Sequence, residues 1–164
     1  NIFNNHSDRV RMANLAQAIN VLQAVILTQG NKMLLTPTYH VMEMYNVHQD
    51  AKLLPLSIQS ADYVVGGQKL PAVSGSASVD SLGRTHVSLV NIDATKEQTV
   101  TLSIEGGKYS NLAGRILASG RLQDYNSFDN PNKIKPAVFN GASLSGGTLT
   151  VKLPPFSVVV LALK

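Results

Sequence analysis

Histidine is the first residue type to examine for chemistry, because it is the usual general base near neutral pH. The chain has four histidines, at His6, His40, His48 and His86. His40 and His48 are eight residues apart, and this is not the spacing of a metal site. We therefore interpret the histidines as surface or packing residues and expect no metal.

The other candidate acid-base residues are three glutamates, Glu43, Glu97 and Glu105. Two carboxylates flanking one bond are the usual machinery of glycoside hydrolysis. Nothing in the spacing of these three indicates such a pair, since Glu43 falls on the exposed side of a predicted helix and the others border turns. The chain has no cysteine for a thiolate nucleophile or a cysteine zinc site. We therefore expect no catalytic residue and no cofactor in this chain.

Length and composition narrow the class of protein. With 164 residues, the chain is long enough for one domain, or for one domain plus a piece of another. The net charge is +4, but the Lys and Arg residues form no run along the sequence. This argues against nucleic acid as a partner. No apolar run reaches the ~18 residues that would span a bilayer, so no membrane partner is expected. The compartment stays open between cytoplasm, periplasm and cell exterior. The first residue is Asn1, and we expect a piece of a longer chain.

A shift in composition predicts two structural units. The first 50 residues contain all four methionines but only one of the 12 glycines. The remainder contains the other glycines and six of the seven prolines. Glycine and proline punctuate short strands and turns, so the shift marks a change of architecture. We predict a boundary near residues 52–55, which gives units 1–53 and 54–164.

The first unit is predicted to form a strand followed by two helices. Residues 9–13 alternate between polar and apolar, as a short strand does. A helix should follow and end before Gly30, because apolar residues recur with the period of one helical face at Leu15, Ile19, Leu22 and Ile26. Thr36 as N-cap and Pro37 at the first helical position predict the second helix.

The second unit is predicted to be an antiparallel β-sandwich, jelly-roll-like. Seven or more short apolar segments are separated by turn residues, at 54–58, 77–79, 86–92, 99–104, 112–118, 142–144, 149–153 and 156–163. Gly146-Gly147 is typical of a tight hairpin turn. The final segment, Phe156–Leu163, is almost uniformly apolar and should be a central strand. Asn126 and Asp129 precede Pro131 and are predicted to organise a turn.

Five segments resemble the C-terminal part of the α-L-arabinofuranosidases of glycoside hydrolase family 51. The most specific is residues 1–26, NIFNNHSDRVRMANLAQAINVLQAVI, followed by residues 35–45, LTPTYHVMEMY. The second unit contributes residues 87–93 (VSLVNID), 125–132 (YNSFDNPN) and 153–161 (LPPFSVVVL). The resemblance covers nearly the whole chain and is weakest over residues 57–84.

This resemblance implies a retaining glycosidase that removes terminal α-L-arabinofuranosyl groups from plant polysaccharides. Residues 1–53 would be the last strand and helices of a (β/α)8 barrel, and both catalytic glutamates would lie upstream of Asn1. In the family, the glutamine of the motif Met-Ala-Asn-x-Ala-Gln contacts arabinose, and that position is Gln17 here. Asn14 also follows the predicted strand, at the C-terminal end of the barrel strands, where active-site residues of such barrels lie. Gln17 and Asn14 are therefore the predicted substrate-binding residues, and this chain alone should be inactive.

Two readings from other classes remain open. One is a non-catalytic carbohydrate-binding module, although the chain has no tryptophan and few aromatic residues on which sugars could stack. The other is a purely structural sandwich that stiffens the barrel or mediates a homo-oligomer. For a member of the family, the expected partner is an L-arabinose-containing oligo- or polysaccharide. Helix-end polar contacts are the alternative role for Gln17 and Asn14.

Overall fold

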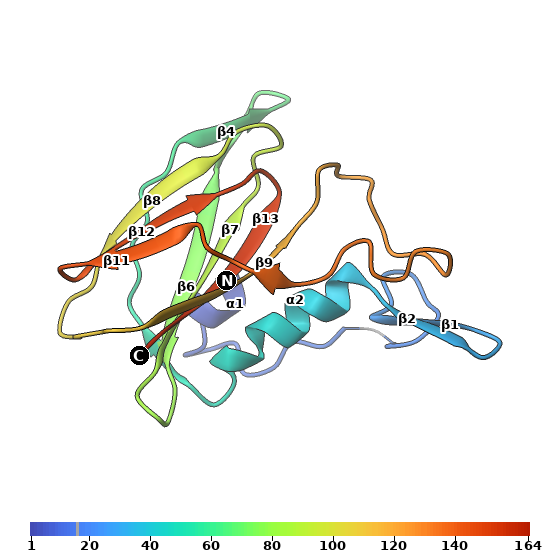
Figure 1. Cartoon of the computed structure of the whole chain (residues 1–164), viewed down its shortest axis with the longest axis horizontal. Helices are drawn as coiled ribbons and strands as arrows, with labels where there is room; N and C mark the ends of the chain where they lie inside the picture. The colour runs from blue at the N-terminus through green and yellow to red at the C-terminus, as the bar shows by residue number, and fades with distance from the viewer. Residues whose placement is uncertain (16) are drawn as a thin grey trace.

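Two antiparallel β-sheets form the body of the molecule in a computed structural model, which describes residues 1–15 and 17–164. The larger sheet has six strands in the order β10-β9-β13-β7-β6-β3, and the smaller has three in the order β11-β12-β8. The two sheets face each other as the layers of a sandwich, as Figure 1 shows. The strands of the larger sheet are β3 (Lys52–Leu54), β6 (Val73–Val79), β7 (Thr85–Asn91), β9 (Leu112–Ala118), β10 (Ala137–Val138) and β13 (Ser157–Leu163). Those of the smaller sheet are β8 (Gln98–Ser103), β11 (Ala142–Ser145) and β12 (Thr148–Leu153).

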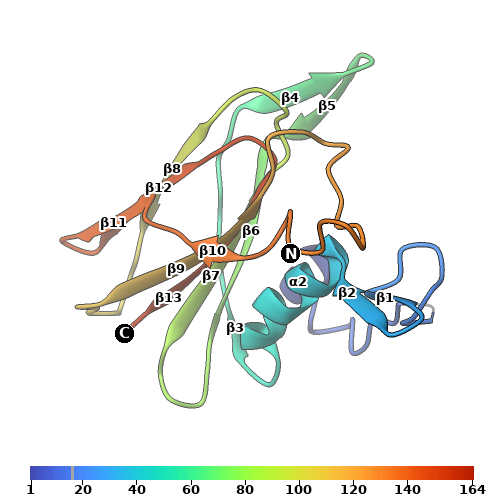
Figure 2. The same ribbon diagram turned by 45° about the vertical axis from the view of Figure 1, so that its right-hand side comes forward.

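Two hairpins extend beyond the sandwich. β1 (Ile26–Gln29) pairs with β2 (Lys32–Leu35), and β4 (Asp62–Val65) pairs with β5 (Gln68–Pro71). They project from different parts of the molecule, as Figure 2 shows. Three helical segments complete the described chain: α1 (Ile2–Asn5), α2 (Pro37–Tyr45) and the 3-10 turn η1 (Asn46–His48).

The core lies between the sheets and follows from strand alternation. On β8 and β12 every second side chain is buried, including Val100, Leu102 and Val151. These pack against inward-facing residues of the larger sheet such as Leu89 and Leu161. β13 pairs with β7 on one side and β9 on the other, so the prediction of a central last strand is confirmed. Full burial of a leucine or valine contributes about 1.5–3 kcal/mol, which explains why this apolar run occupies the middle of the sheet.

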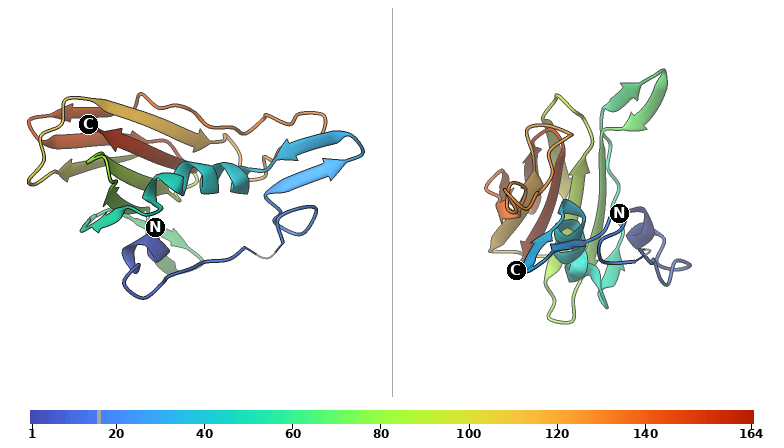
Figure 3. Two further views of the ribbon diagram at one scale, coloured as in Figure 1. Left: turned by 90° about the horizontal axis from the view of Figure 1, so that it is seen from below. Right: turned by 90° about the vertical axis from the view of Figure 1, so that its right-hand side faces the viewer.

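The outer face of the larger sheet is covered by α2, as Figure 3 shows. Met44 of α2 is only 1% exposed and packs in one cluster with Leu117, Ile134 and Val160. The helix begins as the sequence predicts: Thr36 is the N-cap and its hydroxyl accepts a hydrogen bond from the Tyr39 amide, with Pro37 in the first turn. The larger sheet therefore buries apolar side chains on both of its faces, against the smaller sheet on one side and beneath α2 on the other.

The predicted helix over residues 15–28 is wrong. Gln17, Asn20 and Gln23 have positive φ values of 46°, 55° and 60°, which an α-helix cannot contain. Residues 26–29 instead form β1, and Gly30, with φ 58°, turns the chain into β2. Most of the stability of a helix in a protein comes from burying its apolar face. No such burial occurs here, since Leu22 is 93% exposed. Ala16, within this predicted helix, lies outside the described residues.

The predicted strand over residues 9–13 is also wrong for the chain as described, because a strand exists through pairing and these residues belong to no ladder. A (β/α)8 barrel consists of parallel strands alternating with helices. Among the described residues the paired strands are antiparallel, so no portion of a barrel is evident in them. The predicted sandwich, in contrast, is confirmed as mainly antiparallel sheets with few short helices.

Candidate functional site

A polar cluster lies where the N-terminal segment and η1 meet the outer face of the larger sheet. Alternation along β6 and β7 places small hydroxyl side chains on this face, opposite the apolar core residues. His48 lies between two of them, with Nδ1 2.7 Å from Ser78 Oγ and Nε2 2.5 Å from Ser88 Oγ. Asn1 Oδ1 accepts hydrogen bonds from Ser76 Oγ and Tyr45 OH, both at 2.9 Å. These six residues are called the outer-face cluster below.

The electrostatics of this cluster suit packing rather than acid-base chemistry. Burial lowers the pKa of His48 to about 4, and burial raises the pKa of Tyr45 to about 12. Both groups are therefore neutral near pH 7. With both ring nitrogens of His48 hydrogen-bonded, the imidazole joins η1 to β6 and β7. This agrees with the interpretation of His48 as a packing residue.

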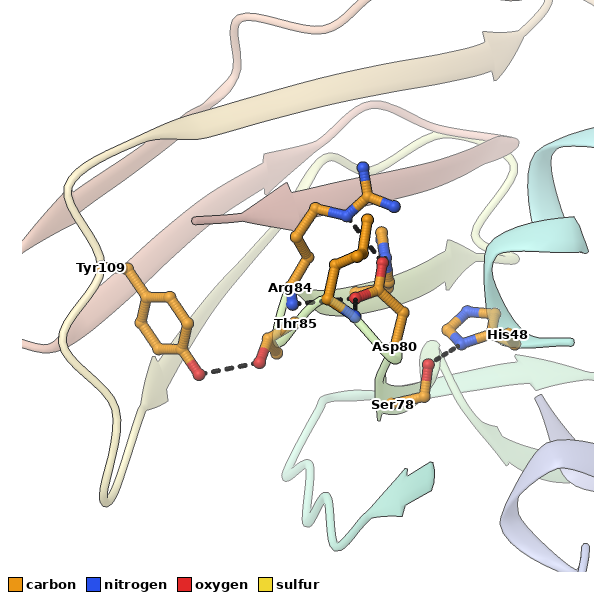
Figure 4. Close-up of polar contacts among 8 residues, drawn as sticks. His48, Ser78, Asp80, Arg84, Thr85 and Tyr109 are labelled. Carbon is orange, nitrogen blue, oxygen red and sulfur yellow. Dashed lines mark hydrogen bonds and ion pairs between the residues drawn. The ribbon is translucent and has the colours of Figure 1, made fainter. Parts of the chain in front are cut away.

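A histidine–aspartate pair, His86 and Asp80, lies at the turn between β6 and β7, and Figure 4 shows Asp80 with its partner Arg84. Asp80 Oδ2 is 3.0 Å from His86 Nε2 and 2.7 Å from Arg84 Nε. Asp80 Oδ1 accepts from the backbone N–H groups of Leu82 and Arg84. The hydrogen bond with His86 is the main reason why the pKa of Asp80 is well below its usual range. His86 Nδ1 is buried and has no hydrogen-bond partner among the described residues, so no nucleophile completes a triad there.

A cavity of about 470 Å³ opens between the two sheets near the β8 end. Its volume is within the range of small-molecule sites, but most of its lining is apolar, with Leu56, Val87 and Ile104 among the residues. The hydroxyls of Thr85 and Tyr109, also in the lining, bond to each other at 2.7 Å (Figure 4). A sugar presents hydroxyl groups on nearly every carbon, so this lining does not suit a carbohydrate.

The two predicted substrate-binding residues lie away from both polar groups. Asn14 and Gln17 are exposed, in the segment that leads from α1 to β1. Gln17 adopts a left-handed backbone conformation, which is uncommon for a residue other than glycine. The structure brings neither side chain into the outer-face cluster, and their role as substrate contacts stays a prediction.

One of the three glutamates lies on α2, and the other two flank β8. Glu43 is on the exposed side of α2, as predicted, and its carboxylate accepts two hydrogen bonds from Arg115 of β9, each 2.8 Å long. These bonds lower the pKa of Glu43. Glu97 precedes β8 and Glu105 follows it, both exposed. Glu43 therefore holds α2 against the sheet instead of pairing with a second carboxylate.

The sequence did not predict the contacts that two asparagines make at this end of the molecule. Asn20 was predicted to lie within a helix, yet its side chain bonds Thr28 twice. Asn126 was predicted to organise a turn through its own backbone. It is instead buried, and donates to the carbonyl oxygens of Leu35 and Ile134 while accepting from the Ile134 amide. The one available signal was residue type, since asparagine tolerates left-handed backbone and imitates backbone hydrogen bonds.

The described part of the chain contains neither a cluster of metal-ligating side chains nor a membrane-spanning helix. No group of three or more His, Asp or Glu side chains within residues 1–15 and 17–164 could hold a metal ion. The described helices are too short for one to cross a membrane.

The fold defines an antiparallel β-sandwich domain with a helical segment packed on one outer face. A model of the family "Alpha-L-arabinofuranosidase C-terminal domain" matches residues 1–157. The chain belongs to this family, as the C-terminal domain of a glycoside hydrolase family 51 (GH51) α-L-arabinofuranosidase.

Individual relatives agree with this assignment. The chain is 44% identical over 164 residues to an intracellular exo-alpha-L-arabinofuranosidase of Bacteroides ovatus, covering 99% of this chain and 32% of the relative. Its sequence is 45% identical to that of the GH51 arabinofuranosidase from Xanthomonas axonopodis pv. citri, and the two structures superpose with a TM-score of 0.96. The match covers 99% of this chain and 33% of that one. The Thermotoga maritima alpha-L-arabinofuranosidase, solved as an arabinose complex, shares the fold at 22% identity and a TM-score of 0.81, over 96% of this chain and 35% of that one. The chain thus spans about a third of the length of these relatives.

Proposed function

We propose that this chain is the C-terminal part of a retaining glycosidase that removes terminal α-L-arabinofuranosyl residues from plant polysaccharides. The observation that carries the proposal is 44% identity, over 99% of the chain, to an exo-acting enzyme of that name. Retaining glycosidases need a nucleophile and an acid/base carboxyl about 5 Å apart. We place both of these groups in the part of the longer protein that precedes Asn1.

The test compares the isolated chain with the longer protein on an aryl α-L-arabinofuranoside. We expect turnover by the longer protein and none by the chain. Turnover by the chain that survives repurification and disappears in Glu43→Gln, Glu97→Gln or Glu105→Gln would overturn the proposal. Product analysis on arabinan and arabinoxylan fragments then shows which of these L-arabinose-containing polymers the longer protein cleaves.

We also propose the division into units 1–53 and 54–164, with the first unit completing a (β/α)8 barrel. Large apolar side chains that face solvent are concentrated in the first unit: Ile2, Phe3, Met12, Leu15, Ile19, Leu22, Met33 and Met42. Exposed large apolar side chains that are concentrated in one part of a chain are typical of a surface that another domain covers. In the longer protein, amide hydrogen exchange should therefore be slower over residues 9–25 than in the isolated chain. Equal exchange in both would contradict this division.

Within that barrel, Gln17 is proposed to contact the arabinofuranosyl group, with Asn14 beside it. An amide both donates and accepts hydrogen bonds, which suits sugar hydroxyls. Left-handed backbone at a residue other than glycine costs free energy and recurs at ligand sites. The exposed amide of Gln17, at φ 46°, fits that description.

A structural role for the sandwich is the second candidate, and one specific observation favours it. α2 buries Met44 against the outer face of the larger sheet, while Glu43 pairs with Arg115 of the same sheet. The sandwich would then stiffen the barrel or support a homo-oligomer without touching sugar. Calorimetric titration of the isolated chain with arabinan oligosaccharides separates the alternatives, because binding would instead indicate a carbohydrate-binding module.

A further inference from the structure

We propose that Asn20 is a positioning residue, which holds the loop of residues 17–28 in the conformation that presents Gln17 to the substrate. This loop is called the Gln17 loop below. The inference rests on the proposed function, in which Gln17 contacts the arabinofuranosyl group. It adds a residue that acts through Gln17 and does not itself touch the sugar.

The contacts of Asn20 close the Gln17 loop from one side to the other. Its Oδ1 accepts from the backbone N–H of Thr28 at 2.7 Å, and its Nδ2 donates to Thr28 Oγ1 at 2.8 Å. Its own backbone N–H donates to the carbonyl of Ile26 at 3.2 Å. An exposed asparagine usually leaves its amide to water, whereas here both ends of the amide are engaged with β1. Asn20 therefore joins the start of the loop to the strand that ends it.

The backbone of this loop requires such a cross-link. Gln17, Asn20 and Gln23 each have positive φ, so every third residue is left-handed. Each such residue costs free energy unless it is glycine, and asparagine tolerates the conformation best. Strained backbone of this kind persists only where the surroundings over-determine it. The bonds from the Asn20 side chain to Thr28 contribute to that determination, beside the backbone bonds that Val25 and Ile26 donate to the carbonyl of Ala18.

The far end of the loop is fixed to the sandwich. Thr36 donates through Oγ1 to the carbonyl of Ala24 at 2.8 Å, and through its backbone N–H to Val25 at 3.0 Å. The preceding residue, Leu35, accepts from Asn126 Nδ2 at 2.8 Å. A continuous set of hydrogen bonds thus runs from the loop before β10, through the start of α2, to the Gln17 loop. These segments lie beside one another at the hairpin end of the molecule, as Figure 3 shows. Next to Gln17, the carbonyl of Ala18 accepts from the backbone N–H groups of Val25 and Ile26, both at 3.1 Å, and Asn20 adds the side-chain cross-link.

The test measures kcat/KM of the full-length protein on an aryl α-L-arabinofuranoside. Because small misplacements of a positioning group can cost up to about 100-fold, Asn20→Ala should lower kcat/KM roughly tenfold. Asn20→Asp should restore most of the activity, since a carboxylate accepts from both the Thr28 N–H and the Thr28 hydroxyl. Asn20→Gly keeps the left-handed backbone and loses the cross-link, so it should resemble Asn20→Ala. The matched control is Asn31→Ala, an exposed asparagine in the β1–β2 turn, which should leave kcat/KM unchanged.

A double-mutant cycle with Gln17→Ala separates the two proposals. If Asn20 acts through Gln17, then Asn20→Ala should cost less than about twofold in the Gln17→Ala background. An equal loss in both backgrounds, or no loss in the wild type, overturns the role of Asn20 while Gln17 keeps its own. Unchanged kinetics for Gln17→Ala overturn the substrate contact itself, and the role of Asn20 with it.

Discussion

Removing the side chain of Asn126 should destabilise the fold strongly, although the residue is in a long irregular connection. Asn126 is 4% exposed and makes three hydrogen bonds: it donates to Leu35 and Ile134 at 2.8 and 2.9 Å and accepts from Ile134 at 2.7 Å. Asn126→Ala leaves one N–H and two carbonyl groups without these partners. An unsatisfied buried polar group costs about 1–3 kcal/mol, so we expect the free energy of unfolding to fall by about 3 kcal/mol.

Thermal and urea unfolding measure this loss. For a chain of this length, about 3 kcal/mol corresponds to a decrease in Tm of roughly 6–12 °C. The matched control is Asn130→Ala in the same loop, because Asn130 is exposed and its loop contacts use its backbone N–H and carbonyl groups, not its side chain. The control should stay within about 0.5 kcal/mol of the wild type. A loss below about 0.5 kcal/mol for Asn126→Ala, equal to the control, would refute the reasoning that this side chain joins the sandwich to β2.

Three further predictions concern the sheet and its outer face. Because burial lowers the pKa of His48 to about 4, protonation of this residue favours the unfolded chain. The free energy of unfolding should therefore be highest above about pH 6.5 and should fall as the pH drops toward 4. Urea unfolding at several pH values should give a flatter profile for His48→Gln. Leu161→Ala in the central strand, where the side chain is fully buried, should cost about 2–5 kcal/mol in the same assay, whereas Leu82→Ala at an exposed turn should cost little. Arg115→Gln should cost only about 0.2–1 kcal/mol and lose its effect in high salt, since the side chains of Arg115 and Glu43 are 48% and 42% exposed.

Local signals in the sequence predicted the elements that local chemistry determines. Thr36 and Pro37 define the start of α2 whatever lies nearby, and the apolar run of β13 has no polar side to offer to water. Gly146-Gly147 fixed a hairpin because both residues adopt positive φ, at 56° and 80°. Gly66-Gly67 connects β4 and β5 in the same way; the pair was interpreted as a turn, but the two strands that it joins were not predicted from the sequence.

The remaining features depend on partners far away in the chain. The stripe from Leu15 to Ile26 has helical spacing, but the described chain offers it no surface for burial, and the left-handed residues between them prevent a helix. His48 bonds serines 30 and 40 residues further along, and Asn126 bonds a carbonyl 91 residues before it. Residue spacing within one segment carries no information about such pairs. The resemblance to a family is the only basis for predicting Gln17 as a substrate contact, whereas the bonds between Asn20 and Thr28 follow from the three-dimensional structure.

The most direct test of the whole account is Gln17→Ala in the full-length protein, with kcat/KM and Tm measured on one preparation. Loss of a buried hydrogen bond to the substrate costs about 1–3 kcal/mol, or roughly one to two decades in kcat/KM. We expect this loss on an aryl α-L-arabinofuranoside with Tm nearly unchanged, because Gln17 is exposed in the chain. A lower Tm with unchanged kinetics would contradict it and leave Gln17 as a residue that only supports the fold.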